Sequence, residues 1–318
     1  MKIGIIGIGS IGGLIAGLIG NTKKHELVLF TNTEMQKLEL ITNGLTIKMP
    51  LGNSDLKLNQ NIFSIYSKDD LPNYNSKKCD LVLICTKSNS TLNAAEITKV
   101  IISNEGHCIS IQNGIGNENI ISSIIGFNSV LGGVITHGAN RINSTIINWA
   151  GIGELFIGCM PLTKIKNENI EEIIDVLNDS GLNASFISDI RSKIWLKLAI
   201  NAAVNPLASI CGVKNGALLE PLLFESACSA MFEVLNVARE LEIQIPDNFE
   251  MIEILSNILK STSENRCSML QDIMNGKTTE IDSICGEVIR KAEMHGIQTP
   301  INSTLMAIIT GITSTNTN

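Results

Sequence analysis

The sequence predicts an α/β domain with a doubly wound parallel sheet, followed by an all-α domain. In the first half of the 318-residue chain, short apolar runs typical of buried strands alternate with helical patterns. A glycine-rich turn follows the first apolar run at residues 7–12. From Asp189 onward the strand signals stop, and helical periodicity continues to about residue 310. We therefore expect a sheet domain over residues 1–187 and a helical domain over residues 188–318.

The strands of the first domain are predicted from short apolar runs, and the helices from the amphipathic patterns between them. The expected strands lie near residues 2–6, 26–30, 80–85, 107–111, 130–135 and 183–187. The expected helices lie near residues 10–20, 33–43, 91–102, 117–124 and 168–179. Residues 144–158 predict an antiparallel hairpin at the edge of the sheet, because two β-type runs flank a glycine-containing turn.

The helical domain is punctuated by prolines and glycines, which end helices more often than they continue them. Breaks are expected at Pro206, Gly212, Gly216, Pro246, Gly276 and Pro300. The Ser-, Thr- and Asn-rich tail after Thr313 is expected to be disordered.

The glycine-rich turn matches the pattern G-x-G-x-x-G. It consists of Gly7, Ile8, Gly9, Ser10, Ile11 and Gly12, placed between an apolar strand and an apolar helix. Such a turn lets backbone N–H groups approach a pyrophosphate at the positive end of the helix, so it predicts a Rossmann-type dinucleotide site. A signal peptide is the alternative, but the glycine spacing and the missing small-residue cleavage pattern argue against it.

The end of the second strand bears on which dinucleotide binds. An acidic residue there holds the ribose hydroxyls of NAD, whereas a basic one favours the 2′-phosphate of NADP. Asn32 follows the strand here, and Glu34 and Lys37 lie just beyond it. This pattern leaves the cofactor undecided.

Composition narrows the range of partners. The formal net charge is −7 and no basic run is present, which argues against nucleic acid or an anionic membrane as partner and favours a small molecule. The 8 cysteines include no C-x-x-C pair and predict reduced thiols of a cytoplasmic protein. The 4 histidines have no metal-ligand spacing, so no metal site is expected.

A polar stripe interrupts the apolar helix expected after residue 190. Lys197, Asn201 and Asn205 are four residues apart and therefore share one face of that helix. Asparagine is a poor helix former, so two of them at this spacing need an explanation. The stripe is a solvated surface or a site of chemistry, and the stripe alone does not distinguish the two.

Four motifs together resemble the ketopantoate reductase family over nearly the whole chain. They are the glycine turn, the helix segment K-L-A-I-N-A-A-V-N-P at 197–206, and the late motifs S-M-x-x-D at 268–272 and T-E-I-D at 279–282. The resemblance implies NADPH-dependent reduction of 2-dehydropantoate to (R)-pantoate, on the route to pantothenate and coenzyme A. It also implies that the ligands bind between a Rossmann domain and a helical one.

The resemblance implies a role for each matching residue. Lys197 would be the general acid toward the ketone oxygen, and Glu280 would orient it and contact the nicotinamide ribose. The matching substrate-binding residues are Asn113, Asn201, Asn205, Asn215, Asn265 and Ser268. The matching cofactor contacts beyond the glycine turn are Asn32, Lys87, Asn113, Ala139 and Glu280. His137 is expected to be structural.

One departure and two alternatives remain open. The family places an arginine where this chain has Asn32, so Lys37 could meet the 2′-phosphate instead, or the enzyme could take NADH. The substrate could be another branched or aromatic 2-oxo acid. A non-catalytic dinucleotide sensor is the other function class, because fold alone does not establish turnover. The helical domain is also compatible with a homodimer.

Overall fold

The computed structural model describes residues 1–50 and 53–315, and the chain forms two compact units. We call the first the sheet unit, which consists of Met1–Gln112 and Asn117–Ile190. The second, the helical unit, consists of Asn113–Gly116 and the residues from Arg191 onward. The segment Asn113–Gly116 thus belongs with the helices, although both of its neighbours in the chain belong with the sheet.

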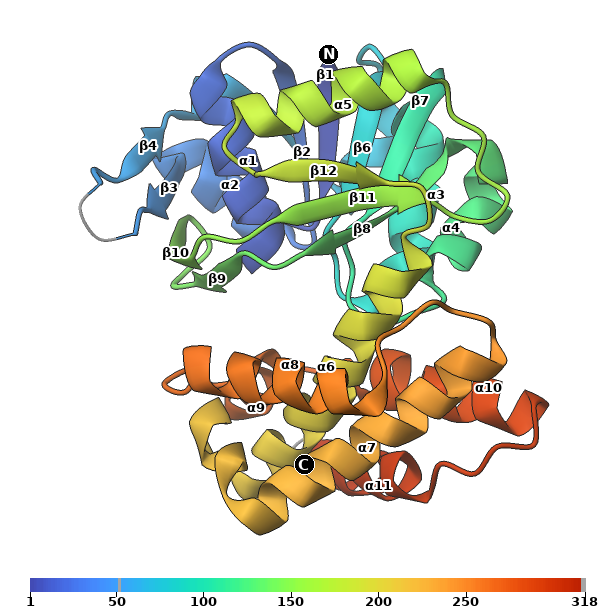
Figure 1. The fold of residues 1–318 in the computed structure, drawn as a ribbon. Helices are drawn as coiled ribbons and strands as arrows, with labels where there is room; N and C mark the ends of the chain where they lie inside the picture. The colour runs from blue at the N-terminus through green and yellow to red at the C-terminus, as the bar shows by residue number, and fades with distance from the viewer. Residues whose placement is uncertain (51–52, 316–318) are drawn as a thin grey trace. The chain divides into compact units, whose positions relative to one another are not determined.

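An eight-stranded sheet forms the centre of the sheet unit (Figure 1). In spatial order its strands are β12 (Ala184–Ile187), β11 (Leu155–Cys159), β8 (Val130–Ile135), β7 (Ile102–Ser110), β6 (Cys79–Ile84), β1 (Lys2–Ile6), β2 (Glu26–Thr31) and β5 (Phe63–Ser67). Neighbouring strands are parallel except for β8 and β11. After β1 the chain builds β2 and β5 on one side and returns to β6 on the other, which makes β1 and β6 the switch point where ligands bind in such sheets.

Helices cover both faces of this sheet, as the alternation of strands and helices predicts. On one face α1 (Ser10–Thr22), α2 (Glu34–Asn43) and α5 (Asn167–Asp179) contribute to one apolar core. On the other face α3 (Thr91–Ile101) and α4 (Asn117–Ile125) contribute to a second core. Both faces of the central strands are therefore buried, which accounts for their continuous apolar sequences. The α/β fold class of this domain is confirmed.

A four-stranded sheet beside α1 is not predicted from the sequence. Its order is β4 (Leu56–Leu58), β3 (Leu45–Lys48), β10 (Ile146–Gly151) and β9 (Gly138–Arg141). Two glycines of α1 permit its close approach, because a Cβ at Gly13 would lie 2.7 Å from Ile147 and one at Gly17 would lie 2.2 Å from Ile47. The glycines after the turn therefore serve helix packing as well as the turn.

The hairpin prediction for residues 144–158 is wrong. Both runs are strands, but β10 pairs with β9 and β3, whereas β11 pairs with β8 and β12 in the other sheet. The glycine-containing link redirects the chain between two sheets, and pairing with distant strands outweighs the local turn. Two other strand predictions were incomplete: β5 is absent from them, and β7 begins at Ile102 rather than near residue 107.

The helical unit is all α, as expected. Its helices are α6 (Arg191–Cys211), α7 (Pro221–Glu240), α8 (Asn248–Ser261), α9 (Ser268–Met274), α10 (Glu287–Met294) and α11 (Pro300–Thr315). A π-helical turn, η6 (Asp282–Gly286), precedes α10, and a short 3-10 turn, η5 (Asn215–Leu219), follows α6. Within the part of the sheet unit that the structure describes there are four further 3-10 turns, η1 (Gln60–Ile62), η2 (Lys68–Asn73), η3 (Ser88–Ser90) and η4 (Phe127–Ser129).

Two boundary predictions in this unit need correction. Pro206 lies inside α6 instead of ending it, because it is itself buried between the buried residues Asn205 and Ala208, and this packing outweighs the one lost backbone hydrogen bond. Ser314 and Thr315, expected in a disordered tail, belong to α11, and residues 316–318 lie outside the described residues. By contrast, Gly212, Pro246 and Gly276 lie between helices, and Pro300 begins α11.

Helix α6 is the core helix of its unit. Among the described residues it alone is long and apolar enough to span a membrane, with a mean hydropathy of 1.4, but 61% of that stretch is buried inside the protein. Burial of Ile194, Trp195 and Leu198 explains the composition of this helix without a membrane.

A buried polar network holds the carboxyl ends of β6 and β7 together. Gln112 Nε2 donates to the hydroxyls of Thr86 at 3.1 Å and Thr91 at 2.9 Å, and Thr91 donates to Asn117 Oδ1 at 2.8 Å. Glu118 lies next to this network and is 4% exposed. Burial raises the pKa of its carboxyl to about 7, against the opposing effects of hydrogen bonds from its own backbone and from Ser110.

We expect Glu118→Gln to stabilise the protein at high pH and to leave it nearly unchanged at low pH. The folded pKa lies above the ordinary carboxyl value of 4.5, so the stability that Glu118 contributes is present below that value and is lost as the pH rises through about 7. The gain at pH 8.5 should be roughly 3 kcal/mol in the free energy of unfolding, measured with urea. Glu96→Gln, an exposed change on α3, is the control. Parallel pH profiles for wild type and Glu118→Gln would contradict the assignment.

Candidate active site

The polar stripe of α6 lies among buried residues. Asn205 is 6% exposed, and Lys197 and Asn201 are half-buried. Apolar residues of α6 occupy the core on the other sides of the helix, so the stripe is held in place by packing. The interpretation as a solvated surface stripe therefore does not apply.

The Lys197 ammonium is the chemically distinctive group of the helical unit. Burial lowers its pKa to about 8, and the negative charge of Glu280 opposes this shift. A lysine with this pKa gives up a proton near neutral pH far more readily than an ordinary lysine does. The group is therefore suited to act as a general acid toward an oxygen that gains negative charge.

Glu280 is held by the segment that leaves β7. The Asn113 side-chain amide donates to Glu280 Oε2 at 3.0 Å, and both residues belong to the helical unit. The Glu280 carbonyl accepts from Ile284 N at 3.1 Å and from the Ser283 hydroxyl at 3.0 Å. The π-helical turn therefore fixes the backbone at Glu280 while Asn113 fixes the carboxylate, an arrangement in keeping with the frequent occurrence of π-turns at functional sites.

The Asn113 segment joins the helical unit through a close backbone contact. Ile115 N donates to the Ser283 carbonyl at 3.3 Å. Gly114 has a φ of +85°, and a Cβ there would lie 2.4 Å from the same carbonyl oxygen. The glycine of this Asn-Gly pair, which the sequence describes equally well as part of a common turn, is therefore required for this approach.

A second group of polar residues surrounds Asn215. Its backbone N–H donates to the Asn265 carbonyl at 2.9 Å, and its side-chain amide donates to the Thr262 hydroxyl at 3.1 Å. Its Oδ1 atom is buried without a hydrogen-bond partner among the described residues. A buried acceptor without a partner is costly, so this atom is poised to accept a hydrogen bond from a ligand.

Asn265 and Ser268 are exposed and lie on either side of Cys267, two residues before it and one residue after it. The Cys267 thiol lies 3.6 Å from the Asn205 carbonyl oxygen on α6, which brings this segment to the polar stripe. Apart from Asn201, which lies half-buried on α6 between Lys197 and Asn205, the structure gathers the predicted residues of the helical unit into two groups. One contains Lys197, Glu280 and Asn113, and the other contains Asn205, Asn215, Asn265 and Ser268.

The glycine turn of the sheet unit fits a dinucleotide. A Cβ at Gly12 would lie 2.1 Å from the Gly7 carbonyl oxygen, and one at Gly7 would lie 2.7 Å from Thr86, so both positions require glycine. At Gly9, the N-cap of the 13-residue helix α1, a Cβ would meet nothing within 4 Å. No side chain caps this helix end, so its N–H groups are available to a phosphate in the open space beside Gly9.

Neighbouring elements hold this turn in place. Gly7 N donates to the Phe30 carbonyl of β2 at 2.9 Å, and Cys85 N donates to the Ile6 carbonyl at 2.8 Å. The buried Gln36 side chain of α2 donates to the Ile8 carbonyl at 2.6 Å. The turn therefore lies between the carboxyl ends of β2 and β6.

The other predicted cofactor contacts in the sheet unit surround the turn. Lys87 lies three residues after the end of β6 and directly follows Thr86, the residue that a Cβ at Gly7 would approach to 2.7 Å. Asn32 is exposed and directly follows the end of β2. Ala139 lies on β9, whose last residue, Arg141, donates its backbone N–H to the Ser10 hydroxyl at 3.1 Å. His137 has a structural place, because its ring accepts from Gly153 N at 3.1 Å and donates to the Leu182 carbonyl at 2.9 Å.

Two supporting contacts are not predicted from the sequence. Gln36 is recognisable afterwards, because Thr33 caps α2 by accepting from Gln36 N and so places the Gln36 side chain in the first turn. The hydrogen bond from Asn113 to Glu280 has no sequence signal, since the two residues are 167 positions apart.

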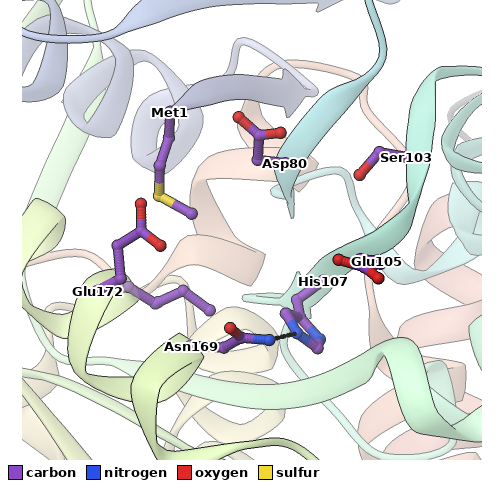
Figure 2. Close-up of a pocket in the computed structure, with 8 residues that line it drawn as sticks. Met1, Asp80, Ser103, Glu105, His107, Asn169 and Glu172 are labelled. Carbon is purple, nitrogen blue, oxygen red and sulfur yellow. Dashed lines mark hydrogen bonds between the residues drawn. The ribbon is translucent and has the colours of Figure 1, made fainter.

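A separate cavity of about 400 Å³ lies at the opposite edge of the main sheet (Figure 2). Its lining combines residues at the amino ends of β1, β6 and β7 with the start of α5, and includes Asp80, Glu105, His107, Asn169 and Glu172. The Asn169 side-chain nitrogen lies 3.0 Å from His107 Nε2. The acidic lining and the position away from the glycine turn make this cavity unsuited to a dinucleotide.

Comparison with known proteins identifies one family over both units. The family described as "Ketopantoate reductase PanE/ApbA" matches residues 3–161, and "Ketopantoate reductase PanE/ApbA C terminal" matches residues 189–313. A protein of Pyrococcus horikoshii named 2-dehydropantoate 2-reductase is 33% identical over 97% of this chain and 96% of its own. A protein of Archaeoglobus fulgidus with the same name is 31% identical over 98% of both chains.

Solved structures have the same fold. The ketopantoate reductase from Ralstonia eutropha superposes with a TM-score of 0.87 at 24% identity, covering 100% of both chains. D-mandelate dehydrogenase, in a ternary structure with NADH and anilino(oxo)acetate, superposes with a TM-score of 0.90 at 23% identity, covering 100% of this chain and 99% of its own.

We expect Lys197 to titrate with a midpoint near pH 8 and Glu280→Gln to move that midpoint lower. The carboxylate opposes the effect of burial, and its neutral amide counterpart removes that opposition while keeping an acceptor for Asn113. The measurement is the rate at which Lys197 reacts with an amine-directed reagent at each pH, read by peptide mass spectrometry. Glu264→Gln, which removes the surface ion pair with Lys214, is the matched control and should leave the midpoint unchanged. An unchanged midpoint in Glu280→Gln would show that this carboxylate does not act on Lys197.

Proposed function

The chain belongs to the ketopantoate reductase family, and we propose that it reduces 2-dehydropantoate to (R)-pantoate with a reduced nicotinamide dinucleotide. The observation that carries this proposal is the half-buried Lys197, whose ammonium has a pKa lowered to about 8 by desolvation while the charge of Glu280 opposes that shift. The names of relatives about 30% identical to this chain support the same substrate. Their family consists of NAD(P)-dependent 2-oxo acid reductases.

The glycine turn of the sheet unit would hold the dinucleotide by its pyrophosphate. The glycine turn and the end of α1 receive the pyrophosphate, with Lys87 and Ala139 close by. Asn113 and Glu280 are the proposed contacts of the nicotinamide ribose. When bound, the reduced nicotinamide supplies a hydride for the ketone carbon of the substrate.

Lys197 completes the reduction by giving one proton from Nζ to the ketone oxygen. The oxygen gains negative charge as the carbon is reduced, and a cation with a transferable proton both stabilises and neutralises that charge. The products are an alcohol and a neutral Lys197 amine, which regains its proton from solvent. Glu280 favours the charged form of Lys197 and so keeps the acid loaded at neutral pH.

The amide and hydroxyl groups orient the substrate. Asn265 and Ser268 are exposed donors next to the stripe and are the proposed partners of the substrate carboxylate. Asn201 and Asn205 would position the ketone and hydroxyl oxygens. The free Oδ1 of Asn215 is suited to accept from the substrate hydroxyl, which a 2-oxo acid without a hydroxyl does not offer.

A second candidate is a reductase of another branched or aromatic 2-oxo acid. The likeness to D-mandelate dehydrogenase with anilino(oxo)acetate favours it, because that protein binds an aromatic 2-oxo acid analogue on the same fold. A dinucleotide sensor has less support. Burying a cation costs stability and is not needed for dinucleotide binding, whereas it lowers the pKa of Lys197 and so favours proton donation near neutral pH.

Initial rates with 2-dehydropantoate and with branched and aromatic 2-oxo acids test the proposal, using NADPH and NADH in parallel. The proposal requires the highest kcat/KM for 2-dehydropantoate with at least one cofactor. A higher kcat/KM for another 2-oxo acid would establish the second candidate. Absence of turnover with every acid, in protein that binds the dinucleotide, would favour the sensor.

We expect Lys197→Ala to lower turnover by at least about 100-fold, the usual effect of removing a positioned acid. Lys193→Ala, one turn earlier on α6, is the matched control and should retain most activity. Steady-state rates over a pH series give both values. Near-normal turnover in Lys197→Ala would remove this residue from the mechanism.

We expect Gly9→Ala to weaken dinucleotide binding at least tenfold while leaving the fold intact. The new methyl group would enter the space proposed for the pyrophosphate, where it meets no protein atom within 4 Å. The free energy of unfolding should change by less than about 1 kcal/mol. Gly12→Ala is the contrasting variant, because its Cβ would lie 2.1 Å from the Gly7 carbonyl oxygen and should destabilise the protein. Unaltered dinucleotide affinity in Gly9→Ala would place the pyrophosphate elsewhere.

A further inference from the structure

The end of β2 lies beside the glycine turn and contains a cluster of charges. Gly7 N donates to the Phe30 carbonyl at 2.9 Å, and α2 begins three residues after β2 ends, at Glu34. In dinucleotide-binding sheets of this kind the adenosine ribose is recognised at the end of this strand. The charged groups at this place therefore decide whether a ribose hydroxyl or a 2′-phosphate is accepted.

Lys37, the residue that could replace the family's arginine, is already paired. Its Nζ lies 2.9 and 2.8 Å from the two carboxylate oxygens of Asp70 and 3.0 Å from Glu34 Oε1. Its side chain is only 16% exposed. The hydrogen bond with Asp70 is the main cause of a raised pKa of Lys37. Its charge is therefore neutralised by groups of the protein itself.

Asp70 is fixed independently of Lys37. Its Oδ2 atom accepts from Ser67 N at 2.6 Å and from the Ser67 hydroxyl at 3.1 Å, which forms a capping box at the start of η2. Ser67 is the last residue of β5 and lies opposite Thr31, the last residue of β2. The Asp70 carboxylate thus lies at the carboxyl edge of the sheet. To reach a phosphate, Lys37 would have to break its ion pair with this fixed carboxylate.

The local charge is unfavourable for a second phosphate. Lys68 and Asp69, which precede Asp70, are both exposed. Glu34, Asp69 and Asp70 outnumber Lys37 and Lys68, so the cluster has one net negative charge. A phosphate monoester brings a further charge of about −1.5 to −2 at neutral pH.

The same cluster is suited to a ribose diol. The Glu34 carboxylate is 48% exposed, and a hydrogen bond from Ser67 and then one from Lys37 lower its pKa, so it is ionised at neutral pH. An ionised carboxylate accepts hydrogen bonds from hydroxyl groups. The exposed Asn32 amide can donate or accept beside it.

We propose that this chain selects NADH over NADPH, and that the cluster of Glu34, Lys37 and Asp70 makes the selection. Glu34 accepts from the adenosine ribose hydroxyls, while Asp70 keeps Lys37 from a 2′-phosphate. This inference rests on the dinucleotide site of the proposed function and narrows its cofactor to the one without the 2′-phosphate.

The test is the direct measurement of dissociation constants for NADH and NADPH, by fluorescence of the reduced nicotinamide on protein without substrate. The dissociation constant of NADPH should exceed that of NADH by at least about tenfold, a difference equivalent to one charge contact. Equal constants, or tighter binding of NADPH, would overturn the proposal.

Variants assign the selection to the cluster. Asp70→Asn retains acceptors for Ser67 but frees the Lys37 charge, and it should lower the dissociation constant of NADPH several-fold with little effect on NADH. Asp69→Asn is the matched control, because it removes one negative charge from the adjacent residue and leaves the ion pair between Lys37 and Asp70 in place. Glu34→Gln should raise the dissociation constant of NADH. If Asp69→Asn and Asp70→Asn act alike, the pairing of Lys37 has no part in the selection.

The outcomes separate this inference from the proposed function. Tight NADH binding without reduction of 2-dehydropantoate contradicts the substrate and leaves the cofactor selection standing. Reduction of 2-dehydropantoate by protein that prefers NADPH contradicts the selection and leaves the substrate standing.

Discussion

The burial of one lysine ammonium is the constraint on which the helical unit depends. Helix α6 takes Lys197 into a covered position because Ile194, Trp195 and Leu198 pack the core on its other sides. Desolvation disfavours the charged form of Lys197, and Glu280 restores part of what is lost. Burial lowers the pKa of Lys197 so that it gives up a proton more readily, and Glu280 limits this lowering so that the ammonium keeps its charge near neutral pH.

That balance requires segments far apart in the sequence to meet. The carboxylate of Glu280 is held by Asn113, and its backbone is held by the π-helical turn that begins two residues later. The close approach of Gly114 to Ser283 secures the Asn113 segment in the same unit. The segment therefore leaves the sheet unit for these few residues, and Lys197, Glu280 and the Asn113 amide that holds the Glu280 carboxylate all belong to one compact body.

The sequence predicts those parts of the fold that depend on local pattern. The main strands, the helices of both units and the polar stripe of α6 follow from apolar periodicity and from the spacing of Lys197, Asn201 and Asn205. The four-stranded sheet does not follow, because β3 and β4 are short and β3 pairs with β10, which comes much later in the chain. For the same reason β10 and β11 look like a hairpin but join different sheets. Which strands pair with one another is determined by contacts between distant parts of the chain, so local sequence patterns do not predict it.

The same limit applies to charge at the end of β2. The sequence shows Glu34 and Lys37 with opposite signs and offers no way to choose between them. Asp70, the residue that pairs with Lys37, lies 33 positions beyond it and is brought to it by the pairing of β5 with β2. A lysine neutralised at 2.8 Å by a fixed carboxylate presents little field to a second anion, whereas the neighbouring carboxylate remains able to accept a hydroxyl. The proposed cofactor selection therefore depends on which charges are already paired, and a count of residue types beside the strand does not supply that information.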